Sequence, residues 1–201
     1  MHTIINVGRS FGSGGGFVAK AIGKKLGIPV YDNELISKTA EESGYSKSLF
    51  AKGEERSLFS VSSFFASGRL SYSDSGYVND NVMFKIQSKV IRSIAEKGDA
   101  IIIGRCSDYI LRDLNCLDVF VCAPMEYRIK RLMENEGLSA DDAEALMRRK
   151  DRTRETYYNY YTFGAWGVAA NYDLCIDSSI LGIEGTADYI IDFGRRAGKI
   201  R

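Results

Sequence analysis

Short runs of β-branched and aliphatic residues alternate along this chain with longer stretches whose apolar positions recur at helical spacing. The short runs are typical of strands that are buried on both faces, and the spaced pattern is typical of helices with one apolar side. The expected strands cover residues 3–7, 28–31, 99–104, 117–122 and 172–176. The expected helices cover 18–26, 82–94, 127–132 and 184–193, with two more that start near 34 and at 139.

Strands that alternate with helices predict an α/β fold, in which an open, mostly parallel five-stranded sheet is covered by helices on both faces. In such sheets ligands bind outside the carboxyl ends of the strands. At 201 residues the chain predicts a single domain. Residues 43–80 are rich in Ser, Gly, Lys and Phe and follow neither periodicity, so we expect an arm there that moves or orders on binding.

Residues 8–17, GRSFGSGGGF, lie between the first predicted strand and the first predicted helix. Strand, glycine-rich loop and helix make up the layout of a P-loop, where backbone N–H groups close around phosphate oxygens at a helix N-terminus. The residues expected to bind a nucleotide are Arg9, Gly12, Ser13, Gly14, Gly15, Gly16 and Phe17. The alternative is a glycine-rich turn that only lets a helix pack closely on a sheet.

The loop departs from the signature G-x-x-x-x-G-K-[ST] at the charged position. Gly15 stands where the lysine belongs, Arg9 where the first glycine belongs, and Phe17 where a hydroxyl would meet Mg²⁺. Loss of a preorganised cation from a phosphate site lowers a rate by roughly two to three orders of magnitude when nothing replaces it. Arg9 lies in the same loop and is the candidate replacement, because a guanidinium can reach a phosphate.

Charge and cysteine content narrow the class of protein. With 27 basic and 26 acidic residues the net charge is +1, which argues against a general nucleic-acid binder and favours a small anionic ligand. The four cysteines form no C-x-x-C pair and the only histidine is His2, so no zinc site is expected and a reducing compartment is favoured. The chain shows neither a signal peptide nor a membrane-length apolar run, and the expected location is the cytoplasm.

Four segments in order resemble the cytidylate kinase-like family of P-loop nucleoside monophosphate kinases. They are GRSFGSGGGFVAKAIGKKLGIPVYD, IIIGRCSDYIL, VFVCAPMEYRIKRLM, and RRKDRTRETYYNYY through NYDLCIDSSILGIEGTADYI. The resemblance implies a P-loop NTPase-type three-layer sandwich with an acceptor-binding arm at about 33–98 and a helical lid at about 137–166. It also implies transfer of the ATP γ-phosphoryl group to CMP or dCMP with Mg²⁺.

Phosphoryl transfer of this kind needs positioning and charge neutralisation more than a general base. The expected catalytic residues are therefore basic side chains and one carboxylate on two helices: Arg128, Arg131, Arg148, Asp151, Arg152 and Arg154. Asp151 could hold a neighbouring arginine or, like Asp32, help to hold magnesium through water. The alternative for this basic run is a solvated helix face with ordinary ion pairs.

The resemblance also assigns residues to the acceptor. Arg105 matches the Gly-Arg pair after the third strand and would grip the acceptor phosphate, while Asp32 would face the acceptor nucleoside or simply cap a helix. Arg69, in the irregular arm, would close over the acceptor base. The aromatic residues Tyr157, Tyr158, Tyr160, Tyr161, Phe163 and Trp166 are interpreted as packing of the lid on the core or across a homodimer contact, with base stacking as the alternative.

Two other functions stay open at this point. A nucleotide sensor would keep the fold and lose turnover, and a kinase for another small phosphate acceptor would share the same loop. Retention of Arg105 and the lid arginines favours the enzyme, because a sensor has no need of cations at the point of transfer.

Overall fold

The computed structural model describes residues 2–42 and 76–201. The strands are β1 (Ile4–Arg9), β2 (Val30–Tyr31), β3 (Ala100–Ile103), β4 (Leu117–Cys122) and β5 (Leu174–Asp177). The helices are α1 (Gly15–Leu26), α2 (Asn33–Glu42), α5 (Gly76–Lys97), α6 (Ser107–Ile110), α7 (Met125–Glu136), α8 (Ala140–Thr162) and α9 (Ser178–Arg196), with a 3-10 turn, η1 (Ala169–Asn171).

The five strands form one sheet in the order β2-β3-β1-β4-β5, and every pair is parallel. β1 is the central strand, with Ile5 opposite Ile101 of β3 on one side and Leu117 of β4 on the other. Aliphatic side chains dominate β1, β3 and β4 because these inner strands are covered on both faces. The predicted α/β fold with a parallel sheet is confirmed.

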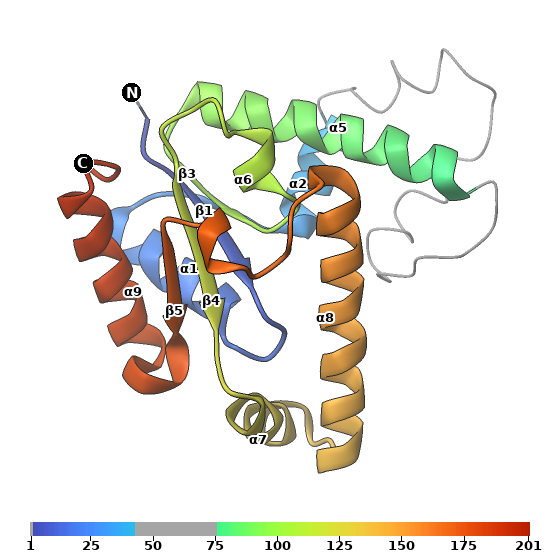
Figure 1. Ribbon diagram of the computed structural model, residues 1–201. Helices are drawn as coiled ribbons and strands as arrows, with labels where there is room; N and C mark the ends of the chain where they lie inside the picture. The colour runs from blue at the N-terminus through green and yellow to red at the C-terminus, as the bar shows by residue number, and fades with distance from the viewer. Residues whose placement is uncertain (1, 43–75) are drawn as a thin grey trace.

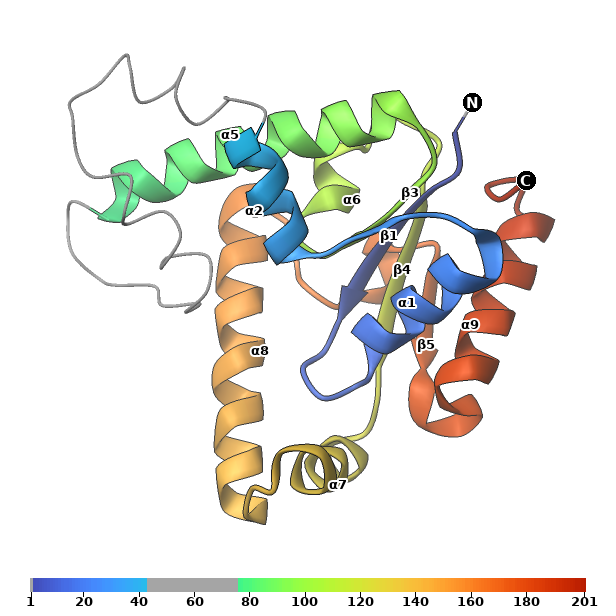
Figure 2. The ribbon, with the colours of Figure 1, turned by 180° about the vertical axis from the view of Figure 1, so that it is seen from behind.

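Helices cover the two faces of the sheet in separate layers. Figure 2 shows α1 and α9 side by side on one face, where Ile22 and Ile190 pack on Val7 and Val119. On the other face α2, α5 and α6 contribute Ile36, Ile86, Ile91 and Ile110 to a second core that includes Ile102. Alternate residues of the strands thus pack into two separate cores, one on each face of the sheet, which produces the three-layer sandwich.

Helices α7 and α8 extend from the carboxyl end of β4 (Figure 1). They share a small apolar cluster of their own, made of Leu132, Ala143 and Met147. α8 begins next to the predicted start at residue 139, and Ser139 caps it, because its Oγ accepts a hydrogen bond from the N–H of Asp142 at 3.2 Å. Within residues 2–42 and 76–201, none of the helices has the length and apolar content needed to cross a membrane.

The aromatic residues of α8 and of the segment that follows it pack against α5 and the sheet, as predicted for most of them. Tyr161 stacks on Phe84 of α5 with ring centroids 4.0 Å apart, and Trp166 meets Phe120 of β4 edge-on at 5.3 Å. The Tyr158 hydroxyl donates to Asp108 at 2.7 Å. The prediction is wrong for Phe163, which is 91% exposed at the C-cap of α8.

Several predicted boundaries differ from the structure. α5 begins at Gly76, six residues before the predicted start, and the four-residue helix α6 was not predicted. α9 begins at Ser178, earlier than the predicted 184, because Asp177 caps it by accepting from the N–H of Ser179 at 2.8 Å. Its first turn is then interrupted at Gly182, with φ 66° and ψ −176°. The apolar periodicity that supports the prediction begins only after that kink.

Candidate functional site

The loop between β1 and α1 contains two left-handed glycines, Gly12 and Gly14, both with φ 80°. Gly14 is the N-cap of α1. The side chain of Ser13 is buried, with its Oγ 2.8 Å from the carbonyl of Ser10 and 3.0 Å from that of Val121. The Ser13 hydroxyl therefore stabilises the loop itself, and only backbone groups at this residue remain for a ligand.

A serine from the far end of the chain anchors the same loop. The Ser178 hydroxyl lies 2.5 Å from the carbonyl of Ser13 and 3.1 Å from that of Cys122. It is fully buried, so the loop, the end of β4 and the start of α9 meet at one side chain. Sequence reasoning did not find Ser178, because the only local signal is a serine after a strand.

Arg9 ends β1 and turns its side chain along the sheet edge rather than out to solvent. A Cβ added to Gly15 would lie only 2.6 Å from the Cβ of Arg9 and 3.2 Å from its Cγ. At the other end of the side chain, a Cβ added to Gly104 would overlap Nη1 of Arg9. The arginine therefore spans the space between the start of α1 and the end of β3, and glycine at both positions leaves room for it.

Three arginines meet at this point. The guanidinium of Arg154, from α8, donates to the carbonyl of Arg9 at 3.0 Å. Burial, together with repulsion from Arg154 and Arg105, lowers the pKa of Arg9 to about 9, and the Asp32 carboxylate acts in the opposite direction. Burial also lowers the pKa of Arg154, the Asp151 carboxylate acts in the opposite direction, and Arg105 and Arg128 add smaller repulsions. These cations are held together at the carboxyl ends of β1 and β3.

Arg105 follows β3 in a strained turn. Gly104, Arg105 and Cys106 have φ values of 70°, 59° and 54°, three left-handed residues in succession. Side chains other than glycine adopt this region at a cost of roughly 1–2 kcal/mol each. The guanidinium of Arg105 lies 5.5 Å from the ring centroid of Tyr157. The turn therefore holds a basic side chain between the end of β3 and α8.

Asp32 serves as a helix cap, which was one of its two expected roles. Its Oδ1 accepts from the N–H of Leu35 at 3.0 Å, at the start of α2. Its charge is also felt at Arg9. Arg69, the third residue expected at the acceptor, lies outside the residues that the structure describes.

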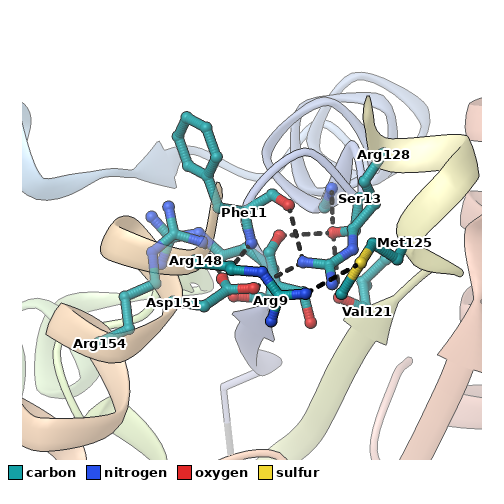
Figure 3. A network of polar contacts seen from close by, with 11 residues as sticks. Arg9, Phe11, Ser13, Val121, Met125, Arg128, Arg148, Asp151 and Arg154 are labelled. Atoms are coloured by element: carbon teal, nitrogen blue, oxygen red, sulfur yellow. Dashed lines mark hydrogen bonds and ion pairs between the residues drawn. The ribbon is translucent and has the colours of Figure 1, made fainter. Parts of the chain in front are cut away.

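Figure 3 shows how α7 and α8 attach to the loop. The Asp151 carboxylate accepts from the N–H of Phe11 at 2.6 Å and from Nη1 of Arg128 at 2.5 Å. Nη1 of Arg128 also donates to the carbonyl of Phe11 at 3.1 Å. The side chains of Arg128 and Asp151 are only 12% and 20% exposed. Asp151 thus holds a neighbouring arginine, one of the roles expected for it.

The other expected residues lie at different places around the loop. The Arg131 guanidinium lies 5.1 Å over the ring of Phe17 and next to Gly14. Arg148 pairs with Glu144 on its own helix at 2.7 Å, and Arg152 is exposed. The structure therefore places five arginines around the loop: Arg9, Arg105, Arg128, Arg131 and Arg154. Arg148 instead forms an ordinary ion pair on the helix surface, which was the alternative expected for the basic run.

The position of the hydroxyl in the signature needs one correction. Counted from Gly14 at the N-cap, the two residues that follow are Gly15 and Gly16, so the hydroxyl position is Gly16. Phe17 lies one residue further and is 60% exposed. A Cβ on Gly16 would meet nothing within 4 Å.

The oxygen atoms of the chain near the loop are largely committed to other partners. Asp151 bonds Phe11 and Arg128, Asp32 caps α2, and the Ser13 hydroxyl faces backbone carbonyls. Among the described residues, no group of three or more His, Cys, Asp or Glu side chains could hold a metal ion. The residues present therefore fit magnesium only as a partner carried by phosphate oxygens and water.

Relatives and solved structures agree with this architecture. A cytidylate kinase of Methanopyrus kandleri is 24% identical over 190 residues, which cover 89% of this chain and 86% of that protein. A cytidylate kinase of Sulfolobus acidocaldarius is 27% identical over 108 residues, and that match covers 53% of this chain and 59% of the relative.

Among solved structures, an uncharacterized protein from Eubacterium ventriosum has a TM-score of 0.70 and 29% identity, covering 94% of this chain and 96% of that one. Shikimate kinase from Bacteroides thetaiotaomicron shares the fold, with a TM-score of 0.53, 14% identity and coverage of 97% and 99%. The model of the cytidylate kinase-like family matches residues 4–180. Because that match includes the loop, the sheet and the basic helices, the chain belongs to the cytidylate kinase-like family.

Proposed function

We propose that this protein is a nucleoside monophosphate kinase that transfers the γ-phosphoryl group of ATP to CMP or dCMP. Family membership and the P-loop kinase fold support a nucleotide kinase. The single observation that carries the proposal is the cluster of Arg9, Arg105 and Arg154 beside the glycine-rich loop. Partly desolvated cations that repel one another are arranged for an anion.

Such a cluster suits the chemistry of phosphoryl transfer between nucleotides. The attacking oxygen of a monophosphate is already anionic at neutral pH, so the protein must mainly align two phosphates and neutralise the charge between them. Backbone N–H groups of residues 12–16, at the start of α1, would bind the donor phosphates. Arg105 would hold the acceptor phosphate, and Arg154 the phosphoryl group in transit.

The remaining arginines would act around the donor. Arg131, next to Gly14 and over Phe17, lies where it can reach the donor phosphates from α7. Arg128 and Asp151 would keep the loop and α8 in register, which makes them positioning residues. Magnesium would arrive with ATP and supply charge neutralisation between the phosphates.

A nucleotide sensor is the second candidate, and a specific observation favours it. Gly15 and Gly16 stand where the signature places its lysine and its hydroxyl, so the loop lacks both of the usual contacts for the transferred phosphate and its metal. A kinase for another small phosphate acceptor is the third candidate. The basic cluster would serve any acceptor phosphate equally well.

The test combines turnover with binding on the same protein. Purified chain is mixed with ATP, Mg²⁺ and one of CMP, dCMP, UMP, AMP or GMP, ADP formation is followed, and ATP and CMP are titrated by calorimetry. Turnover with CMP or dCMP supports the proposal. Binding of ATP without turnover on any monophosphate supports the sensor, and turnover on another acceptor alone supports the third candidate.

A pair of variants links the activity to the site. Arg154→Gln removes a charge from the cluster, and Arg196→Gln removes one from an exposed ion pair on α9. We expect Arg154→Gln to lower kcat by about 100-fold, because it removes a preorganised charge at the transferred phosphoryl group. Arg196→Gln should match the parent. Equal kinetics for all three proteins would refute the assignment of the site.

A further inference from the structure

We propose that Arg9 supplies the phosphate-binding cation that the P-loop signature places on its lysine, and that it does so from the acceptor side of the loop. This inference rests on the proposed phosphotransferase function. It assigns to Arg9 contact with the transferred phosphoryl group and leaves Arg105 as the residue for the acceptor phosphate alone.

Two positions of the P-loop signature have exchanged their kinds of residue in this chain. Where the signature has glycine at its first position and lysine six residues later, this chain has Arg9 and Gly15. The structure explains why the two changes occur together. A Cβ on Gly15 would come within 2.6 Å of the Cβ of Arg9, closer than side-chain carbons pack, and 3.1 Å from the Cβ of Val121. A side chain at position 15 is therefore incompatible with Arg9, and without Arg9 it needs only a small shift of Val121.

The side chain of Arg9 runs from the phosphate loop toward the end of β3. Its Cβ and Cγ fill the space next to Gly15, and its guanidinium reaches Gly104 at the end of β3. It therefore lies between the phosphate loop and Arg105, which begins the turn on the acceptor side. A cation in this place can contact the phosphoryl group while it passes from donor to acceptor.

The positive charge of Arg9 is not explained by an ion pair within the described residues. In the described part of the chain no carboxylate lies within 4 Å of the Arg9 guanidinium as an ion-pair partner. The Asp32 carboxylate raises the pKa of Arg9 through its charge, and its Oδ1 caps α2 by accepting from the N–H of Leu35. With a pKa of about 9, Arg9 is still protonated at neutral pH despite burial and two neighbouring cations. A structural ion pair therefore does not account for its position.

The experiment uses the parent and five variants of the full chain. Arg9→Gln removes the charge, Gly15→Lys adds the lysine to the present loop, and Arg9→Gly with Gly15→Lys restores both residues of the signature. Arg9→Gly alone is the reference for the double variant, and Arg196→Gln, on exposed α9, is the charge control. Glycine is required at position 9 in the double variant, because the Cβ of alanine would keep the close approach.

Each form is assayed for kcat and KM with ATP, Mg²⁺ and CMP, and ATP is titrated by calorimetry in the absence of acceptor. We expect Arg9→Gln to lower kcat by about 100-fold or more, with a smaller change in the KM for CMP. Gly15→Lys alone should be less active than the parent, because its side chain is forced against Arg9. The double variant should exceed Arg9→Gly by at least about tenfold in kcat, because lysine then regains its usual place.

The outcomes separate the inference from the proposed function. A kcat for Arg9→Gln within about threefold of the parent overturns the inference and leaves the kinase intact. If the parent binds ATP without turnover and Arg9→Gln weakens that binding at least about tenfold, the kinase proposal fails while the phosphate contact stands. If Arg9→Gln does not fold, judged by circular dichroism, the double variant decides, and no gain over Arg9→Gly overturns the inference.

Discussion

The left-handed turn after β3 should lower the stability of the protein while it places the Arg105 guanidinium at the site. The substitution Arg105→Gly can measure both effects. Arg105 and Cys106 adopt φ values of 59° and 54°, which side chains other than glycine rarely take. Glycine has no Cβ and pays no such penalty. Replacing Arg105 by glycine should therefore relax the backbone while it removes the guanidinium from the basic cluster.

The size of the effect follows from three contributions. Relief of the left-handed conformation contributes roughly 1–2 kcal/mol in favour of the variant. The greater freedom of glycine in the unfolded chain opposes this by about 0.5–1 kcal/mol. Loss of the contact with the Tyr157 ring, at 5.5 Å, costs about 0.5 kcal/mol more. The expected net change lies between about 0.5 kcal/mol of destabilisation and about 1 kcal/mol of stabilisation, and removal of the repulsion from Arg9 shifts it toward stabilisation.

Phe163 offers a matched control for the backbone effect. It has φ 53° at the C-cap of α8, it is 91% exposed, and its N–H donates to the carbonyl of Asn159, a bond that glycine keeps. Phe163→Gly should stabilise the protein by about 0.5–1 kcal/mol, or roughly 1–4 °C in Tm for a chain of this length. Its kinetics should equal those of the parent.

The assay measures chemical unfolding and steady-state kinetics on both variants. We expect Arg105→Gly to be at least as stable as the parent and to raise the KM for CMP by about 10- to 100-fold, the loss of one charge-assisted hydrogen-bonding partner. If Arg105→Gly were destabilised by more than about 1 kcal/mol while Phe163→Gly gained stability, the strain at this turn would be compensated by contacts of Arg105. An unchanged KM would refute its role at the acceptor phosphate.

Three further predictions concern a partly buried carboxylate in β4 and two groups that anchor the loop. Burial raises the pKa of Asp118 to about 6, above its unfolded value of 3.8, so stability should fall by about 1 kcal/mol between pH 5 and pH 7.5, and Asp118→Asn should flatten that dependence in urea titrations. Asp151→Asn, which weakens the pair with Arg128, should lower the free energy of unfolding by about 1–3 kcal/mol, measured by urea denaturation at pH 7. Ser178→Ala removes the hydroxyl donor that lies within hydrogen-bond distance of the carbonyls of Ser13 and Cys122, and it should cost about 1–2 kcal/mol in the same assay while raising the KM for ATP. Full retention of both values would contradict the role of Ser178 as an anchor of the loop.

Local patterns were sufficient for the framework of this fold. Residues 4–26 form strand, loop and helix as predicted, because β-branched residues, glycines and apolar spacing all act within a few positions of one another. The cap at Ser139 is local in the same way, since its partner Asp142 is three residues away. Such features depend on neighbouring residues in the chain and are visible in the sequence.

The details of the site depend instead on residues that are far apart in the sequence. The anchor from Ser178 to Ser13 joins positions 165 residues apart, and the bond from Arg154 to Arg9 joins positions 145 apart. The left-handed conformation of Arg105 has no local signal, because neither Arg nor Cys favours it. Sequence reasoning could propose which cations belong to the site, and could not predict which of them converge.

Convergence of these cations has a consequence for how the site responds to a phosphate. Arg9 and Arg154 are both desolvated, and repulsion within the cluster lowers the pKa of each. An anion placed between them relieves the repulsion and gives both guanidinium groups a favourable partner. Because folding has already desolvated and assembled these cations, the anion binds more tightly than it would to separate, solvated arginines. A single negative charge offsets the desolvation and mutual repulsion of the two arginines only in part. A phosphoryl group in transit carries charge spread over three oxygens and can engage both Arg9 and Arg154, so the arrangement favours the transferred group over a simple monoanion.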